Sequence, residues 1–321
     1  MSFDFSEAAK RQAAPLPALE RTDLSGITAV VTGANTGIGY EVAKYLAESG
    51  ASKVILACRN EEKGKAAASS LGSVVEYRHL DLASFSSVHE FVRAFKTSGM
   101  PLHLLVNNAG MHSVGKQTTE DGLDLLMQVN HISPFLLTLL LLPIMEAFPL
   151  SRVIWVTSGG AVIPEFPQSS EAHPVGALCA LQFKPEEEHI LYFTSKLLNI
   201  MCCAELARCT QVKVAAAHPG LVATELGKKD VRGENFQPVD LEARWGIKPR
   251  SPAEGAKTVL VPATYNASVV WGQGGRMPIF DHMERAEYPS KATDESLRRK
   301  VWEDTVRLMG LGAGKLEERL L

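Results

Sequence analysis

Tyr192 and Lys196 are two residues whose types and spacing could perform acid–base chemistry. In a helix, positions four apart lie on one face, so the phenol and the ammonium would be neighbours. A free tyrosine has a pKa of about 10, and a cation beside it favours the phenolate and brings proton transfer within reach at neutral pH. The same spacing also occurs on ordinary solvated helix faces. Its meaning therefore depends on what the rest of the chain places around it.

The composition is that of a soluble globular protein, with 321 residues, 45% of them hydrophobic and 21% charged. A net charge of −3 gives no reason to expect nucleic acid or an anionic membrane surface as a partner. The five cysteines are odd in number and lack metal-ligand spacing. We therefore expect reduced thiols, no metal site and a cytoplasmic protein.

Two segments bear on membrane association. Residues 1–25 read as a polar, loosely ordered lead-in and not as an anchor. The strongest apolar run, residues 135–145, contains Pro143 and is shorter than the roughly 20 residues that span a bilayer. We expect no transmembrane segment, and read this run as a core helix or as the interface of a homodimer.

From residue 27 onward, short β-branched runs alternate with helical stretches, which is typical of βαβ units. The pattern predicts an α/β fold of one Rossmann-type domain over residues 26–321, a doubly wound parallel sheet of about seven strands with helices on both faces. We expect strands at 27–31, 53–58, 74–80, 103–107, 153–157, 213–217 and 269–271, and helices that include 38–50, 84–98 and 121–146. Ser251 and Glu254 predict a further helix start, Pro262 its end, and Thr293 the cap of the last helix.

Two stretches, about 159–189 and 225–250, interrupt the alternation. Each follows a predicted strand at its carboxyl end, where open α/β sheets bind ligands. Long loops in compact domains tend to be functional or disordered. We expect these two to form the walls of a substrate site.

The first βα turn is rich in glycine and reads Thr32-Gly33-Ala34-Asn35-Thr36-Gly37-Ile38-Gly39. Glycines there permit a tight turn and let backbone N–H groups approach a pyrophosphate at the helix N-terminus. A glycine-rich turn without a ligand is the alternative. We predict that residues Gly33, Asn35, Thr36, Gly37, Ile38 and Gly39 bind a dinucleotide.

The ends of the next two strands bear on the cofactor. A dinucleotide site often has an acid after the second strand, for the ribose 2′-OH, whereas this chain has Cys58 and Arg59. A guanidinium in place of a carboxylate suits a 2′-phosphate, so we predict NADP(H). Asp81 could accept a hydrogen bond from an adenine amino group or cap the following helix.

Further polar groups follow the later strands. Asn107 and Ala109 close the fourth strand and could line the dinucleotide or stabilise the turn. Pro134 has no N–H, so the carbonyl of Asn130 should lose its helical bond and could hold a water, or the proline could simply kink the helix. Thr157 and Ser158 end the fifth strand with hydroxyl groups. After the sixth strand comes a turn that could bind a nicotinamide, formed by Pro219, Gly220, Val222 and Thr224.

Together these motifs resemble the short-chain dehydrogenase/reductase family. The residues that carry the resemblance are T-G-x-x-x-G-I-G at 32–39, N-N-A-G at 107–110, Asn130, Ser158, Y-x-x-x-K at 192–196 and H-P-G at 218–220. L-A-C-R-N at 56–60, S-P-A-E-G-A at 251–256 and the final V-W-E-D-T-V-R-L are similar to the retinol-dehydrogenase-like branch. Members of that branch often have a membrane-anchoring N-terminus, which we do not find in residues 1–25.

The resemblance implies four catalytic roles. Tyr192 would be the acid–base residue, and Lys196 would lower its pKa while binding the nicotinamide ribose. Ser158 would polarise the substrate carbonyl, and Asn130 would sustain a water relay. The gap from Ser158 to Tyr192 is longer than is usual in the family, as in the retinol-dehydrogenase-like branch.

The sequence thus predicts an NADP(H)-dependent oxidoreductase that interconverts a carbonyl and an alcohol. The alternatives are a carbon–carbon double-bond reductase, a catalytically silent nucleotide-binding scaffold and, less favoured without a G-x-S-x-G elbow, a hydrolase using Ser158 and His218. Phe166, Leu178, Leu181 and Phe183 in the first long loop suggest a bulky lipophilic substrate, retinoid-, steroid- or polyketide/terpenoid-like. These residues could instead pack the loop onto the body of the protein.

Overall fold

A parallel sheet forms the centre of the computed structural model, which describes residues 5–112, 115–164, 172–183, 188–226, 247–264 and 277–311. Within these residues the sheet has eight strands in the order β3-β2-β1-β4-β5-β6-β7-β8. Every neighbouring pair is parallel except β7 and β8. The strands are β1 Thr28–Thr32, β2 Lys53–Cys58, β3 Val75–His79, β4 Leu104–Asn107, β5 Arg152–Val156, β6 Lys213–His218, β7 Ile279–Asp281 and β8 Glu284–Ala286. The predicted doubly wound α/β fold is confirmed.

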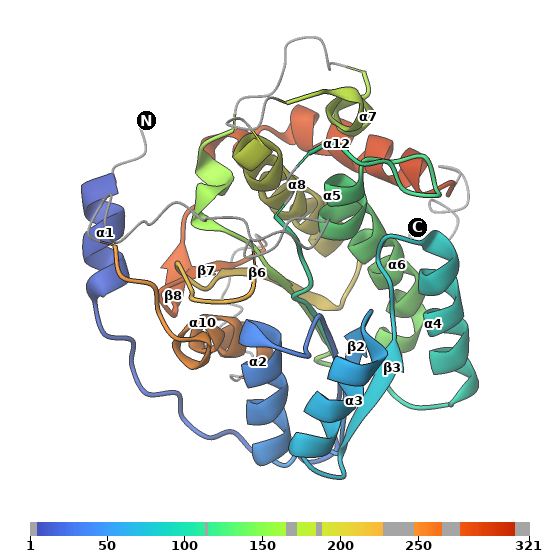
Figure 1. The fold of residues 1–321 in the computed structure, drawn as a ribbon, viewed down its shortest axis with the longest axis vertical. Helices are drawn as coiled ribbons and strands as arrows, with labels where there is room; N and C mark the ends of the chain where they lie inside the picture. Colours follow the sequence, from blue (N-terminus) through green and yellow to red (C-terminus); the bar gives the residue numbers. More distant parts are fainter. Residues whose placement is uncertain are drawn as a thin grey trace.

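Helices cover both faces of the sheet (Figure 1). On one face, α2 Gly37–Glu48, α3 Glu61–Ser70 and α10 Pro252–Thr264 share a core with alternate strand residues. On the other face, a larger core contains α4 Phe85–Thr97, α5 Leu125–Met127, α6 Ser133–Met145, α8 Glu188–Cys209 and α12 Glu295–Leu308. The strands are apolar along their length because both of their faces are buried. Strand order reverses between β1 and β4, which is the ligand-binding switch point of such folds.

The last strands differ from the prediction. The expected seventh strand at 269–271 lies outside the described residues, and β7 and β8 form a short hairpin further along the chain. The hairpin turns at His282 and Met283, whose φ angles are 53° and 66°. Positive φ at both turn positions matches the right-handed twist of a two-residue hairpin. Strands of three residues without glycine at the turn give almost no sequence signal.

The helix expected over 121–146 is interrupted. A π-helical turn, Gln128–Ile132, separates α5 from α6. Pro134 cannot donate to the carbonyl of Asn130, so the helical ladder breaks there as expected. α6 then continues through Pro143 and ends at Met145.

Helix ends follow side-chain capping, with two corrections. The capping box before α10 is confirmed, since Ser251 and Glu254 bond each other reciprocally at 3.0 and 3.2 Å. This helix continues past Pro262 to Thr264, where the described residues stop, so the predicted end at Pro262 is wrong. The last helix is capped by Asp294, which accepts from the N–H of Leu297 at 3.0 Å, and not by Thr293.

The polar lead-in is more ordered than expected. Phe5–Ala13 forms a helix, α1, at the edge of the molecule near β7 and β8 (Figure 1). Gln12 near its end is only 8% exposed. The expectation of a loosely ordered segment is therefore wrong for these residues, because Gln12 bonds backbone groups of Leu221 and Lys248, far away in the sequence.

Candidate active site

The glycine-rich turn lies between β1 and α2, at the switch point of the sheet. Gly33 and Gly37 both have φ of 63°, a conformation that side chains disfavour. A Cβ on Gly33 would lie 2.9 Å from the Cα of Ala109. A Cβ on Gly39 would collide with the amide of Asn108. These close approaches explain the glycines within the protein itself and leave a turn of bare backbone at residues 33–39, the glycine cradle.

The N-terminus of α2 opens from this cradle. Its capping residue, Thr36, makes no side-chain bond to the first turn of the helix. The N–H groups of that turn therefore remain available, and with the helix dipole they suit an anion. Ile38 packs toward Gly255 of α10, which fixes the direction of α2. The residues present fit the pyrophosphate of a dinucleotide.

The end of β2 carries no carboxylate. Cys58 is 2% exposed, and its sulfur accepts hydrogen bonds from the backbone N–H groups of Ala34 and Asn35. Burial raises the pKa of the Cys58 thiol to about 11, although these two bonds act to lower it. Cys58 therefore stays neutral and supports the turn, while Arg59 is exposed beside it.

Asp81 does not cap the following helix. The cap of α4 is Ser84, whose hydroxyl accepts from the N–H of Ser87. Asp81 instead accepts from the N–H of Ala83 at 2.9 Å through one carboxylate oxygen. The capping alternative is thus wrong, and the adenine alternative stays a prediction.

The end of β4 is fastened to the turn. Thr32 accepts hydrogen bonds from the N–H groups of Asn108 and Ala109, both at 3.0 Å. The amide of Asn108 donates back to the carbonyl of Thr32 at 2.9 Å. Asn107 donates to Thr138 at 2.9 Å, and its Oδ1 is buried without a partner among the described residues. Both roles expected for this segment, stabilising the turn and lining the site, are compatible with these contacts.

Ser158 and Tyr192 meet at the carboxyl edge of the sheet. Ser158 follows β5, and its hydroxyl accepts from the N–H of Gly160 at 3.2 Å. Tyr192 lies in the first part of α8 and is 9% exposed. Burial raises the pKa of Tyr192 to about 12, and a hydrogen bond with Ser158 acts in the opposite direction. The ring of His112 stacks on Tyr192 with centroids 4.8 Å apart, a contact that no sequence motif indicated.

Lys196 lies one turn after Tyr192 on the same helix, as the spacing predicts. Its Nζ is 5.6 Å from the centroid of the Tyr192 ring and donates to the carbonyl of Val156 at 3.2 Å. Burial lowers the pKa of Lys196 to about 8. The expected lowering of the tyrosine pKa is therefore not found in this structure, where burial raises the pKa of Tyr192 and only the bond with Ser158 acts to lower it.

Asn130 joins the π-helical turn to this cluster. Its Oδ1 accepts from the N–H of Met111 at 2.8 Å, and its Nδ2 donates to the carbonyl of Met111 at 2.9 Å. A Cβ on Gly110 would lie 3.3 Å from the Nζ of Lys196 and 3.4 Å from the Oδ1 of Asn130. Gly110 therefore lets the lysine and the asparagine share one small space.

The freed carbonyl of Asn130 has a protein partner that we did not predict. Asn199 of α8 donates to it at 3.0 Å, and the Oδ1 of Asn199 contacts the Nδ1 of His131 at 2.7 Å. The Nε2 of His131 contacts the hydroxyl of Thr305 at 2.9 Å. A carbonyl has two lone pairs, so the water role stays a prediction. Asn199 lies seven positions after Tyr192 along α8, which puts the two residues two turns apart on one face.

The turn after β6 faces the dinucleotide turn. A Cβ on Gly37 would lie 3.3 Å from the Cγ2 of Thr224, and a Cβ on Gly255 would collide with Val222. Gly220 has φ of 83°. The structure thus brings the two predicted cofactor-binding turns together, with Pro219 buried between β6 and this turn.

The long loops are described only in part. Residues 165–171, 184–187 and 227–246 lie outside the described residues, so Phe166 and most of the second loop do too. In the first loop, α7 Pro174–Ala180 packs against α12. Leu178 is 2% exposed, and Leu181 and Phe183 pack against the main core. For these three side chains the packing alternative holds.

The apolar run 135–145 is mostly core. Phe135, Leu136, Leu137 and Leu141 are fully buried within the chain. By length and composition, two described helical segments, Leu125–Met145 and His189–Cys209, could cross a membrane, but 78% and 72% of their apolar windows are buried. Such buried windows are typical of core helices.

Among the residues that the structure describes, no cluster of three His, Cys, Asp or Glu side chains could hold a metal ion.

Comparisons with known proteins agree with this architecture. A family model described as short chain dehydrogenase matches residues 27–171. Human dehydrogenase/reductase SDR family member 13 is 39% identical over 309 residues, covering 91% of this chain and 76% of the relative. Human retinol dehydrogenase 13 is 35% identical over 314 residues, covering 94% and 90%. A solved metagenomic short-chain oxidoreductase in complex with NADP is 27% identical with a TM-score of 0.54, over 77% of this chain and 95% of that one.

The site and the comparisons therefore lead to one conclusion. The turn between β1 and α2 fits a dinucleotide, and the same edge of the sheet gathers Ser158, Tyr192, Lys196 and Asn130. Relatives above 30% identity cover most of the chain and bear the names of dehydrogenases. This chain belongs to the short-chain dehydrogenase/reductase family.

Proposed function

We propose that this protein is an NADP(H)-dependent oxidoreductase that interconverts a carbonyl and an alcohol on a lipophilic small molecule. The observation that carries the proposal is the hydrogen-bonded pair of Ser158 and Tyr192, with Lys196 one helical turn away. Two hydroxyl donors at the carboxyl edge of a dinucleotide-binding sheet suit a substrate oxygen.

A bound NADPH would supply the hydride for reduction. The chain's own residues would orient the substrate and move the proton. Ser158 would donate a hydrogen bond to the carbonyl oxygen, and Tyr192 would give that oxygen its proton. With a pKa raised to about 12, Tyr192 is protonated at neutral pH, as a proton donor must be. Lys196, whose pKa is lowered to about 8 by burial, would bind the nicotinamide ribose beside the tyrosine.

We propose NADP(H) over NAD(H) because β2 ends on a neutral, buried Cys58 followed by an exposed Arg59. A guanidinium can pair with a 2′-phosphate, whereas a carboxylate would repel it. Replacing both residues, Cys58→Asp with Arg59→Leu, should shift the kcat/KM preference toward NADH. A double variant that retained the preference for NADPH would show that another residue sets it.

For the substrate, we propose a retinoid-, steroid- or polyketide/terpenoid-like carbonyl or alcohol. The similarity to a relative named retinol dehydrogenase supports this class.

We further propose a cytoplasmic location, because the long apolar helices are mostly buried in the core. Fractionation of cells that express the full chain would test the location, and recovery in the membrane pellet would contradict it.

The test of the function is a substrate panel. The purified chain is mixed with NADPH or NADH and with lipophilic aldehydes, ketones and α,β-unsaturated ketones, including retinaldehyde. The loss of reduced-cofactor absorbance is followed and the products are identified. The proposal expects alcohols as products, with NADPH preferred. Saturated ketones would indicate a double-bond reductase, and cofactor binding without turnover on the whole panel would indicate a silent scaffold.

A further inference from the structure

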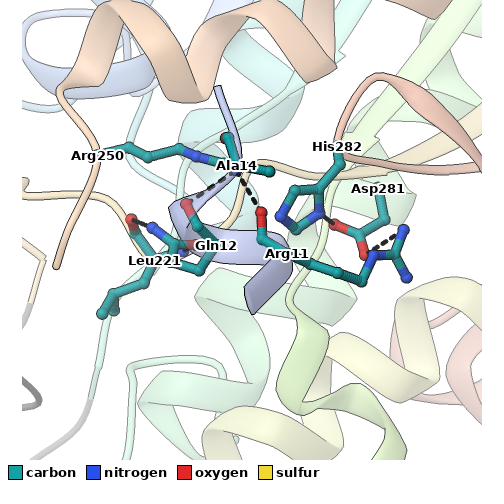
Figure 2. Close-up of polar contacts among 7 residues, drawn as sticks. All are labelled: Arg11, Gln12, Ala14, Leu221, Arg250, Asp281 and His282. Atoms are coloured by element: carbon teal, nitrogen blue, oxygen red, sulfur yellow. Dashed lines mark hydrogen bonds and ion pairs between the residues drawn. The ribbon is translucent and has the colours of Figure 1, made fainter. Parts of the chain in front are cut away.

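The helix α1 contacts the turn after β6 through the buried side chain of Gln12 (Figure 2). The Oε1 of Gln12 accepts from the N–H of Leu221 at 3.0 Å, and its Nε2 donates to the carbonyl of Leu221 at 2.9 Å. The same Nε2 donates to the carbonyl of Lys248 at 3.1 Å. Gln12 thus satisfies both backbone groups of Leu221, as a neighbouring strand would.

Arg250 fastens the end of α1 to the same turn. Its guanidinium donates to the carbonyls of Arg11 and Gln12 at 3.0 and 3.1 Å, and to that of Ala14 at 3.4 Å. A cation at these last carbonyls also suits the negative end of the helix dipole. The backbone of Arg250 pairs with the turn itself, since its N–H donates to the carbonyl of Leu221 at 2.9 Å. Arg250 is 6% exposed, so these contacts are shielded from water.

A second contact ties α1 to the end of the sheet. Arg11 lies 3.4 Å from the carboxylate of Asp281, the last residue of β7, which His282 also contacts at 2.6 Å (Figure 2). Asp281 pairs with His218 in the register between β6 and β7. Although burial acts to raise it, the pKa of Asp281 is lowered by the bond from His282 and by the nearby basic groups. This carboxylate is therefore available as an anchor for Arg11.

The opposite side of the turn faces the predicted cofactor cradle. The side chain of Thr224 lies beside Gly37. The side chains of Val222 and Ile38 both lie beside Gly255. At Gly220, a Cβ would lie 2.7 Å from the Oε1 of Gln12, so the turn has almost no space to move toward α1. The five residues 220–224 are held between α1 on one side and the dinucleotide turn on the other.

We propose that Gln12 is a positioning residue for the cofactor, and that α1 holds residues 219–224 in the conformation that binds the nicotinamide half. The inference rests on the proposed function, since it requires that the chain bind NADP(H). If docking of α1 favours cofactor binding, then cofactor binding must favour docking of α1 to the same extent. This reciprocity separates a positioning role from a purely structural one.

The first test compares Gln12→Ala with Lys10→Ala, a change at an exposed residue on the same helix. Kd for NADPH is measured by fluorescence titration, and kcat and KM by cofactor absorbance. Loss of the contacts to Leu221 should weaken NADPH binding roughly tenfold and raise its KM in parallel, while kcat stays within about twofold. The control should leave all three unchanged. A lower Tm for Gln12→Ala with an unchanged Kd would overturn the proposal.

The second test needs no substitution and covers the case in which Gln12→Ala does not fold. Hydrogen exchange of the wild-type chain is followed by mass spectrometry with and without saturating NADPH. The proposal expects slower exchange in both the 219–224 peptide and the α1 peptide. Protection of the turn without protection of α1 would overturn it. If the wild type binds neither NADPH nor NADH, the proposed function itself fails, and the inference fails with it.

Discussion

Asn199→Leu is the substitution that best separates the fold of this site from its chemistry. In the wild type, the Asn199 amide donates to the carbonyl of Asn130 at 3.0 Å and contacts the ring of His131 at 2.7 Å. Asn199 is 2% exposed, and leucine has a similar volume. The change therefore removes two hydrogen bonds and opens no large cavity.

The stability cost follows from the two groups left behind. A buried polar group without a partner costs about 1–3 kcal/mol, so two of them cost roughly 2–6 kcal/mol. Burial of the leucine side chain returns about 1.5–3 kcal/mol. The midpoints of these two ranges leave a net loss of about 2 kcal/mol in the free energy of unfolding, which urea denaturation would measure.

The catalytic cost follows from the position of Asn130. Its side chain also bonds Met111, next to Gly110 and the Nζ of Lys196. A shift of the π-helical turn would therefore misplace Lys196, the proposed catalytic lysine, and we expect kcat to fall about 10- to 100-fold. Kd for NADPH should change far less.

Thr305→Val is the matched control. It removes the hydroxyl at the far end of the same network, 2.9 Å from the Nε2 of His131, and leaves the contact to Asn130 in place. We expect it to lower stability by a similar amount and to keep kcat within about threefold. Equal kcat losses in both variants, or an unchanged kcat in Asn199→Leu, would show that Asn199 does not position Lys196 through Asn130.

Three further outcomes follow from the structure. Burial lowers the pKa of His131 to about 4, so as pH falls below about 6.5 the imidazole is protonated in the unfolded chain before it is protonated in the folded chain. The stability contributed by neutral His131 should therefore be complete above about pH 6.5 and lost as pH falls toward 4, and urea midpoints across that range would show the loss. Gly39→Ala should weaken NADPH binding and lower stability by about 1–3 kcal/mol, because the added methyl group collides with Asn108. A variant with the Kd and Tm of the wild type would show that the turn does not need a glycine at this position. Asp304→Ala removes the carboxylate that accepts hydrogen bonds from the N–H groups of Val175 and Gly176 in the first turn of α7, at 2.8 and 2.9 Å. Hydrogen exchange in α7 should therefore become faster. The KM for substrate should change, and Kd for NADPH should not.

The sequence was sufficient for features that depend on local pattern. Alternating apolar runs located β1 to β6, and the glycines at 33, 37 and 39 located the turn that needs bare backbone. Pro134 predicted the break in the helix at Asn130, because a proline has no N–H to donate to the carbonyl four residues earlier. Such effects act within a few residues.

Contacts between distant segments could not be predicted. Gln12 and Leu221 are 209 positions apart, and nothing in a polar N-terminal stretch indicates a docking helix. Asp304 anchors α7 from 129 positions away. The pKa of Tyr192 is a third case: the neighbouring lysine predicted a lowered value, but tertiary burial raises it to about 12. Burial depends on the whole fold, which a local spacing of two residues does not reveal.

We propose that Tyr192 transfers the proton in an NADPH-linked carbonyl reduction. Tyr192→Phe removes only the hydroxyl, and the ring can still stack on His112. With the best substrate of the panel, the measurement is kcat together with Kd for NADPH in wild type and variant. We expect turnover to fall at least roughly 1,000-fold, within the range for a lost general acid, and Kd to stay within about twofold. A variant that retained substantial turnover would contradict it.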